Sequence, residues 1–158
     1  MATATYLLGI GSNRRGRHGG PADEVRAALT AVGGVEAVSP LVTSAALGPS
    51  RRAYANAAAL IGSNDPPPVL LDRLKRIERA FGRRPGQRWG ARVIDLDILL
   101  WSRGAWESPG LVVPHRDFRR RAFVLAPLLA LAPDWRDPLT GLAVRHLARR
   151  LTARRPLA

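Results

Sequence analysis

The sequence predicts an α+β fold, a ferredoxin-like βαββαβ sandwich with additional helices at its C-terminal end. Strand-like and helix-like segments follow one another in the order strand, helix, strand, strand, helix, strand, which is the order of that fold. The chain has 158 residues, of which 46% are hydrophobic, enough for one core with little room for a second. No internal repeat or low-complexity segment interrupts the pattern. We therefore expect a single domain over residues 1–158, with residues 152–158 as a frayed tail.

Local composition predicts the first strand and helix. β-Branched and apolar residues at positions 3–10 favour a strand, and glycine, serine and asparagine at positions 9–13 indicate the turn that ends it. Pro21 suits the first turn of a helix, and the acidic residues that follow it complement the positive end of the helix dipole. The helix is expected to stop at Gly33.

The remaining elements follow from the same rules. Further strands are predicted over residues 35–43, 54–61 and 93–101. Helices are predicted over residues 66–81, 123–131 and 144–151. Residues 83–92 are rich in arginine and glycine and are expected to form an exposed loop.

Composition limits the class of protein. A formal charge of +13 suggests an anionic partner, but Lys75 is the only lysine, and a GC-rich coding bias would produce the same excess of arginine. The absence of cysteine excludes disulfides and thiolate metal sites. No apolar run approaches the roughly 20 residues of a membrane span, and the N-terminus does not resemble a signal peptide. We expect a soluble, cytoplasmic protein.

Asp95 and Asp97 interrupt an otherwise apolar strand. Because side chains alternate across a strand, both carboxylates are predicted to point to the same face. The neighbouring apolar side chains are predicted to point to the opposite face: Ile94, Leu96, Ile98 and Leu100. Two adjacent carboxylates repel each other, and a divalent cation such as Mg²⁺, which prefers oxygen ligands, would remove that repulsion. The alternative is a solvated strand face with two acids of no special function.

Cationic residues flank the carboxylates on both sides. Those before them are Arg83, Arg84, Arg88 and Arg92, and those after them are His115, Arg119, Arg120 and Arg121. A metal held by carboxylates and surrounded by guanidinium groups provides what binding and transfer of a polyphosphate require. The chain lacks the G-x-x-x-x-G-K-[ST] motif, so a P-loop enzyme is excluded.

Several of these segments are similar to one known family. Residues 88–100, with the sequence RWGARVIDLDILL, closely resemble the central signature of the 6-hydroxymethyl-7,8-dihydropterin pyrophosphokinases. Further matching segments are residues 9–13, 47–49, Tyr54, Asn56, 77–78, 82–83, 114–115, Arg121, 123–125 and 127–128. The resemblance covers nearly the whole chain, and several motifs in the same order are more specific than any one of them.

The resemblance implies an enzyme that transfers diphosphate from ATP to the hydroxymethyl group of 6-hydroxymethyl-7,8-dihydropterin in folate biosynthesis. The products would be AMP and the pterin diphosphate. Two Mg²⁺ ions would be held by Asp95 and Asp97. ATP and a dihydropterin would be the partners, with no nucleic acid or membrane, and the protein would act as a monomer.

The resemblance also implies roles for individual residues. The catalytic residues would be Arg83, Arg92, Asp95 and Asp97. ATP would be bound by Arg84, Arg88, Trp89, Arg92, Ile98, His115 and Arg121. The pterin would be bound by Ser44, Leu47, Tyr54, Asn56, Trp89 and Phe123. Tyr54 and Phe123 would sandwich the pterin ring, although each alone would more often be a core aromatic residue. Asn56 would bond the polar edge of the ring, or would be a turn residue without that role.

The chain departs from the family pattern at several positions. Ala46 and Ala91 replace prolines, Lys75 stands where some members have glutamine, and Arg116 occupies a position that is often uncharged. The competing class is an RNA-binding module, because a ferredoxin-like sheet and a strong positive charge also describe that class. Such a module needs aromatic residues on its central strands beside a glycine-rich motif, which the sequence lacks. A nuclease or phosphatase would be expected to have more metal ligands.

Overall fold

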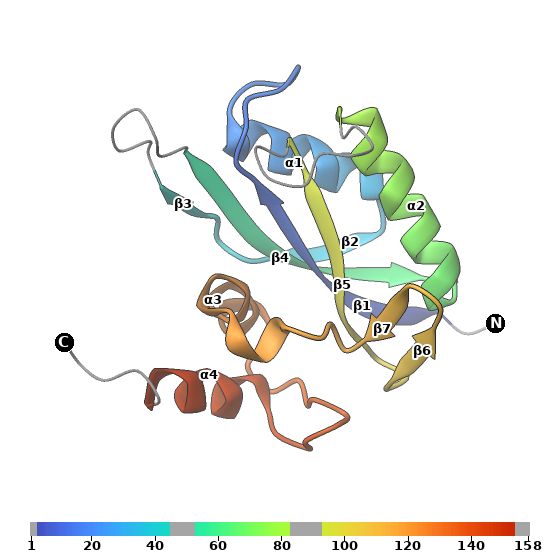
Figure 1. Cartoon of the computed structure of the whole chain (residues 1–158), viewed down its shortest axis with the longest axis vertical. Coiled ribbons are helices and arrows are strands. Elements are labelled where there is room, and N and C mark those ends of the chain that lie inside the picture. The colour runs from blue at the N-terminus through green and yellow to red at the C-terminus, as the bar shows by residue number, and fades with distance from the viewer. Residues whose placement is uncertain (1–2, 45–52, 83–92, 154–158) are drawn as a thin grey trace.

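The computed structural model describes residues 3–44, 53–82 and 93–153 (Figure 1). In chain order the elements are β1 (Ala4–Ser12), α1 (Pro21–Val32), β2 (Val35–Val38), β3 (Val42–Ser44), β4 (Tyr54–Ser63), α2 (Pro67–Ala80), β5 (Asp95–Trp101), β6 (Trp106–Ser108), β7 (Leu111–Val113), the 3-10 helix η1 (Phe118–Arg120), α3 (Ala122–Leu131) and α4 (Val144–Ala153). Helix α4 thus includes residues 152 and 153 of the expected tail, and residues 154–158 lie outside the described ranges.

The strands form a five-stranded sheet in the order β2-β4-β1-β5, with β3 paired to the same strand, β4, as β2. Every pairing in this sheet is antiparallel. Each helix of the first half connects two strands that are not neighbours, so β1 and β4 lie at the centre. This is the arrangement of a ferredoxin-like sandwich, and the predicted α+β fold is confirmed.

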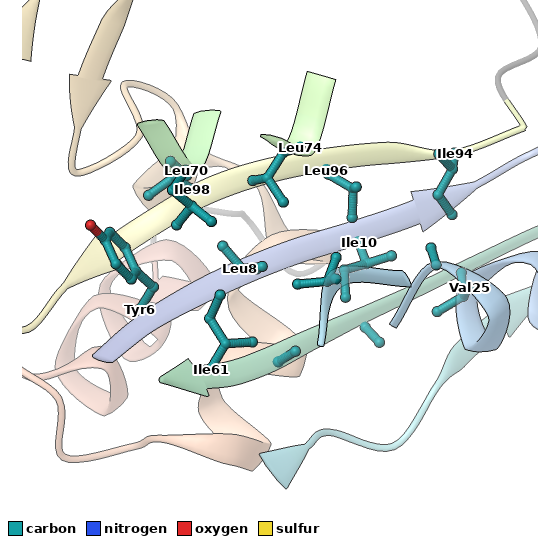
Figure 2. Close-up of a cluster of buried hydrophobic side chains, with 14 of the residues drawn as sticks. Tyr6, Leu8, Ile10, Val25, Ile61, Leu70, Leu74, Ile94, Leu96 and Ile98 are labelled. Carbon is teal, nitrogen blue, oxygen red and sulfur yellow. The ribbon is translucent and has the colours of Figure 1, made fainter. Parts of the chain in front are cut away.

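Helices cover both faces of the sheet, α1 and α2 on one and α3 and α4 on the other (Figure 1). Alternation along β1 sends Leu8 toward α1 and α2 and Leu7 toward α3 and α4. The first core contains Leu70 and Leu74 from α2 against Leu96 of β5 (Figure 2). Within the described ranges, no helix combines the length and the apolar character that a membrane crossing requires.

The strand predicted over residues 35–43 is divided into β2 and β3. Pro40 has no N–H to donate to a neighbouring strand, so regular pairing cannot continue through it. Ser39 instead makes two hydrogen bonds to one residue of β4. Its N–H donates to the carbonyl oxygen of Ala58 at 2.9 Å, and its Oγ accepts from the Ala58 N–H at 2.9 Å. The β6–β7 hairpin, whose strands have three residues each, was not predicted from the sequence.

Leu100 does not share a face with Ile94, Leu96 and Ile98, so that prediction was wrong. Leu8 pairs with Ile98 but Leu7 pairs with Leu100, which leaves Leu99 as an extra residue in β5. A β-bulge of this kind shifts the alternation by one residue. Leu100 therefore packs in the core beneath α3 and α4.

Candidate active site

Two glycines of β1 open a groove on the face of the sheet that carries the carboxylates. Gly9 pairs with Asp97, and Gly11 pairs with Asp95 on one side and Asn56 on the other. Directly paired residues point to the same face of a sheet, so the groove separates the two carboxylates from the Asn56 amide. It forms part of a cavity of about 600 Å³. The turn predicted for positions 9–13 was therefore placed too early, because β1 continues to Ser12.

Asp95 and Asp97 lie on one face of β5, as their spacing predicts. The Asp97 side chain is exposed to the cavity, and Asp95 is half-buried. Although the side chain opens to the cavity, the protein atoms around the Asp97 carboxyl reduce its hydration and raise its pKa above its usual range, and the charges of Asp95 and Glu78 act in the same direction. His115 and Lys75 act in the opposite direction but do not outweigh these causes. The arrangement would favour a bound cation.

Two aromatic side chains line the same cavity without being part of a core. Tyr54, at the start of β4, is 37% exposed, and Phe123, in the first turn of α3, is 51% exposed. The alternative of two core aromatic residues is thus excluded. Arg121 precedes α3, and its guanidinium carbon lies 5.8 Å from the centroid of the Phe123 ring. The cavity therefore offers flat apolar surfaces, the Asn56 amide and the Arg121 guanidinium.

A second cavity, of about 550 Å³, lies on the other side of Asp97. Its walls come from α2, from the β6–β7 hairpin and from the segment that follows the hairpin: Leu71, Lys75, Asp97, Ile98, Glu107, Ser108, Gly110, Leu111, Val112, His115 and Arg116. The backbone N–H of His115 donates to the carbonyl oxygen of Leu99 at 3.0 Å, which fixes this segment to β5. Apolar and cationic groups thus meet in one cavity.

Asp97 lines both cavities, so one carboxylate stands where the contents of the two would meet. The donor set fits Mg²⁺, which commonly takes one or two carboxylates and completes its shell with phosphate oxygens and water. Among the described residues, no group of three or more histidine, aspartate or glutamate side chains could hold a metal by itself. Beyond the described carboxylates, water and phosphate oxygens are the ligands that Mg²⁺ ordinarily takes.

Glu78 on α2 supports the strand that carries the carboxylates. Its side chain is 1% exposed, and Oε2 accepts a hydrogen bond from the Leu96 N–H at 3.1 Å. Leu96 stands between Asp95 and Asp97, so this bond fixes β5 at the candidate metal site. From the sequence, Glu78 is recognisable only as part of a motif, because its burial depends on how α2 packs against β5.

Asp117 connects two of the predicted phosphate-binding residues and was missed. Its carboxylate lies 3.3 Å from Nη2 of Arg121, and its backbone N–H donates to Nδ1 of His115 at 3.2 Å. Since Nδ1 accepts this bond, Nε2 carries the proton in the neutral ring. The four-residue spacing of Asp117 and Arg121 was the available signal, but a charge pair at that spacing is common on protein surfaces.

Part of the predicted site lies outside the described residues: Arg83, Arg84, Arg88, Trp89, Arg92 and Leu47, and the departures Ala46 and Ala91. Ser44 ends β3, where its backbone pairs with Tyr54 beside the first cavity. The described part of the structure brings Tyr54, Asn56 and Phe123 to that cavity. Ile98 and His115 line the second cavity, and Arg121 lines the first rather than the second.

A ferredoxin-like sandwich whose two cavities meet at a carboxylate fits the class of transferases with two substrates. Residues 7–133 match the sequence model of the 7,8-dihydro-6-hydroxymethylpterin-pyrophosphokinase family. The chain belongs to this family. The family and the enzyme class predicted from the sequence are confirmed.

Similar proteins include the 2-amino-4-hydroxy-6-hydroxymethyldihydropteridine pyrophosphokinases of three bacteria. The Pseudomonas aeruginosa protein is 43% identical over 139 residues, 84% of this chain and 83% of the relative. That of Haemophilus influenzae is 37% identical over 140 residues, 85% of this chain and 84% of the relative. That of Synechocystis is 38% identical over 113 residues, 72% of this chain but only 58% of the relative.

Solved structures agree in fold. The Plasmodium falciparum HPPK-DHPS structure superposes with a TM-score of 0.75 over 97% of this chain and 42% of that chain. The sequence identity is 14%, so this likeness supports the fold alone. The chain spans less than half of that longer protein.

Proposed function

We propose that this chain transfers the diphosphate group of ATP to the hydroxymethyl group of 6-hydroxymethyl-7,8-dihydropterin, a step of folate synthesis. The observation that supports it best is the position of Asp97, which borders both an aromatic-lined cavity and a cavity with cationic walls. A transfer between two substrates needs such a meeting point. Membership of the pyrophosphokinase family identifies the group that is transferred.

The pterin is assigned to the first cavity. A flat heterocycle would lie between the exposed rings of Tyr54 and Phe123, which offset stacking stabilises. The Asn56 amide, which both donates and accepts hydrogen bonds, would bond the polar edge of the heterocycle. Backbone and side-chain groups of Ser44 and Leu47 complete our proposal for this site.

ATP is assigned to the second cavity. Ile98 would contact the base, and His115 and Arg121 would bind phosphate oxygens from the two sides of Asp97. Five residues of the 83–92 segment belong to the proposal through the family resemblance: Arg83 and Arg92 as catalytic residues, and Arg84, Arg88 and Trp89 as ATP contacts. Trp89 would also contact the pterin.

The reaction joins the two sites. The hydroxymethyl oxygen attacks the β-phosphorus of ATP, the bond from that phosphorus to the α,β-bridging oxygen breaks, and AMP leaves while the hydroxyl proton passes to solvent. Two Mg²⁺ ions, held by Asp95 and Asp97, would neutralise part of the phosphate charge. Asp97 aligns the two substrates, and the cationic side chains stabilise the charge that develops on the leaving AMP.

The wider context is part of the same proposal. We expect residues 1–158 to act as one catalytic domain and as a monomer, in the cytoplasm, where ATP is available. No nucleic acid or membrane takes part in the reaction as we write it.

The nucleotide product tests the proposal. Purified protein is incubated with Mg²⁺, ATP and 6-hydroxymethyl-7,8-dihydropterin, and the spent nucleotide is separated by chromatography. AMP should appear in equal amount with a pterin diphosphate, and neither should form when the pterin is omitted. ADP accumulating with a monophosphorylated pterin would overturn the proposal. Asp97→Asn, which preserves the size of the side chain, is the matched variant and should form neither product.

A further inference from the structure

The single lysine of the chain projects from α2 into the wall of the second cavity. Lys75 is about half exposed, with 43% of its side-chain surface accessible. Its Nζ lies 3.1 Å from Oε1 of Glu78, one helical turn further along the same helix. Every other basic residue apart from the histidines is arginine, so this position departs from the composition of the rest of the chain.

The partner of Lys75 is a buried carboxylate. Glu78 is 1% exposed, and a charge at such a site is costly unless opposite charge and hydrogen bonds compensate it. The Leu96 N–H bonds one oxygen at 3.1 Å, and the ammonium of Lys75 compensates the charge of the other. The ammonium therefore pairs with a carboxylate that is itself hydrogen-bonded to β5.

Lys75 lines a cavity whose other walls carry His115 and Arg116. Asp97 and Glu107 are the acidic residues of the same walls, and Asp97 is the group to which a metal is assigned. The contact with Glu78 is an ion pair, so the three donors of the ammonium can serve a ligand. An anionic ligand, rather than a neutral one, matches this cavity.

We propose that Lys75 binds the phosphate portion of the nucleotide and that Glu78 is the residue that positions it. The inference rests on the proposed function, since the second cavity must take ATP. Glutamine, which some members have at this position, could donate hydrogen bonds but has no charge. The charge of Lys75 should therefore increase nucleotide affinity beyond what a glutamine would give. This contribution should decrease as the salt concentration rises.

Titration calorimetry with Mg²⁺ and α,β-methylene-ATP tests the contact. Lys75→Gln should weaken the binding of this analogue about tenfold, the difference between a charge-assisted and a neutral hydrogen bond to phosphate. Lys75→Arg should recover most of the loss, and adenosine, which has no phosphate, should bind all three proteins equally. Raising the salt concentration should weaken the wild type more than Lys75→Gln. Equal analogue affinity in wild type and Lys75→Gln, or an equal loss for adenosine, would overturn the inference.

A double-mutant cycle tests the role of Glu78. Glu78→Gln keeps an oxygen that can accept from the Leu96 N–H but removes the charge that holds the ammonium. This change should weaken analogue binding when Lys75 is present and should have little further effect in Lys75→Gln. An equal effect in both backgrounds would show that Glu78 acts through β5 alone, and would refute the positioning role.

Chemical labelling gives a readout on the wild-type protein that does not depend on variants folding. Reductive methylation modifies amines, and Lys75 is the only side chain that can react in addition to the terminal amine, from which peptide mass spectrometry separates it. Mg²⁺ with the ATP analogue should slow modification of Lys75, and adenosine should not. Unchanged modification at saturating analogue would refute the contact. If the wild type binds no analogue at all, the proposed function fails first; if it forms AMP but Lys75 is not protected, only this inference fails.

Discussion

Replacing Gly11 by alanine should weaken pterin binding without unfolding the protein. Gly11 lies on β1 between Asp95 and Asn56. A Cβ atom at this position would lie 2.5 Å from Oδ1 of Asn56, whereas ordinary van der Waals contact begins at 3.4 Å. The other nearest atoms, Cγ of Asn56 and the carbonyl oxygen of Ala55, are at 3.7 and 3.8 Å and need not move. The Asn56 amide alone must give way.

The two consequences of this displacement differ in size. Turning Asn56 away from its preferred rotamer costs about 0.5–1.5 kcal/mol, and replacing glycine with alanine restricts the unfolded chain by about 0.4–1 kcal/mol in the opposite sense. The net change in the free energy of unfolding should therefore stay within about 1 kcal/mol. Displacing the amide leaves polar atoms of the bound pterin unpaired, at about 1–3 kcal/mol, so pterin affinity should fall roughly 5- to 150-fold.

The assay is a titration with 6-hydroxymethylpterin in the presence of Mg²⁺ and α,β-methylene-ATP, with urea unfolding measured in parallel. Gly20→Ala is the control, because Gly20 has φ −74° and a Cβ there would meet nothing within 4 Å. In an Asn56→Ala background, Gly11→Ala should add less than about a twofold loss, since the atom it displaces is gone. An undiminished loss in that background, or none in the wild type, would refute the reasoning.

Three further predictions concern the carboxylates, the exposed aromatic residues and the buried side chain of Asp137. Asp95→Ala and Asp97→Ala should each lower turnover by several orders of magnitude and leave the free energy of unfolding unchanged or higher, because each removes like-charge repulsion; near-normal turnover at saturating Mg²⁺ would contradict this. Tyr54→Ala and Phe123→Ala should each weaken pterin binding, by about 0.5–1.5 kcal/mol for stacking plus the lost buried area, while affinity for the ATP analogue stays the same in calorimetry. Burial would raise the pKa of Asp137, but hydrogen bonds from Arg119, Thr140 and the Leu139 N–H outweigh it and hold that pKa below its usual range. The stabilisation from ionised Asp137 is therefore complete above the pKa of the unfolded state, about 4, and is lost as the pH falls through the lower pKa of the folded state. In urea titrations, the free energies of unfolding of wild type and Asp137→Asn should therefore converge in strong acid.

Periodicity allowed most of the sheet to be predicted, and it failed where side chains carry no periodic signal. Leu7 and Leu8 are both apolar because β1 has a hydrophobic core on each of its two faces, and successive side chains enter different cores. From Ile98 to Leu100, three apolar residues in succession suit either face, so the bulge at Leu99 left no trace in the sequence. The same holds for the three-residue strands of the β6–β7 hairpin, which are too short to show alternation.

In the candidate site, too, the residues that depend on local spacing were predictable and those that depend on packing were not. The shared face of Asp95 and Asp97 depends only on two-residue spacing within one strand, and the structure has it. Glu78 and Lys75 gain their importance from the packing of α2 against β5, and no property of the helix alone distinguishes this pair from a solvated ion pair. Local rules therefore locate the carboxylates but not the groups that surround them.

Gly9 and Gly11 show why a correct local rule can give a wrong structure. Both were interpreted as turn residues, because glycine most often marks a change of chain direction. They lie inside β1, neither has a positive φ angle, and both pair with their neighbours on either side. A Cβ atom at position 9 would approach the Leu99 side chain to 3.3 Å, and one at position 11 would displace Asn56. What these positions require is the absence of a side chain, which leaves the groove between the carboxylates and the amide open. That requirement comes from the other strands of the sheet, and it becomes visible only when β4 and β5 are placed on either side of β1.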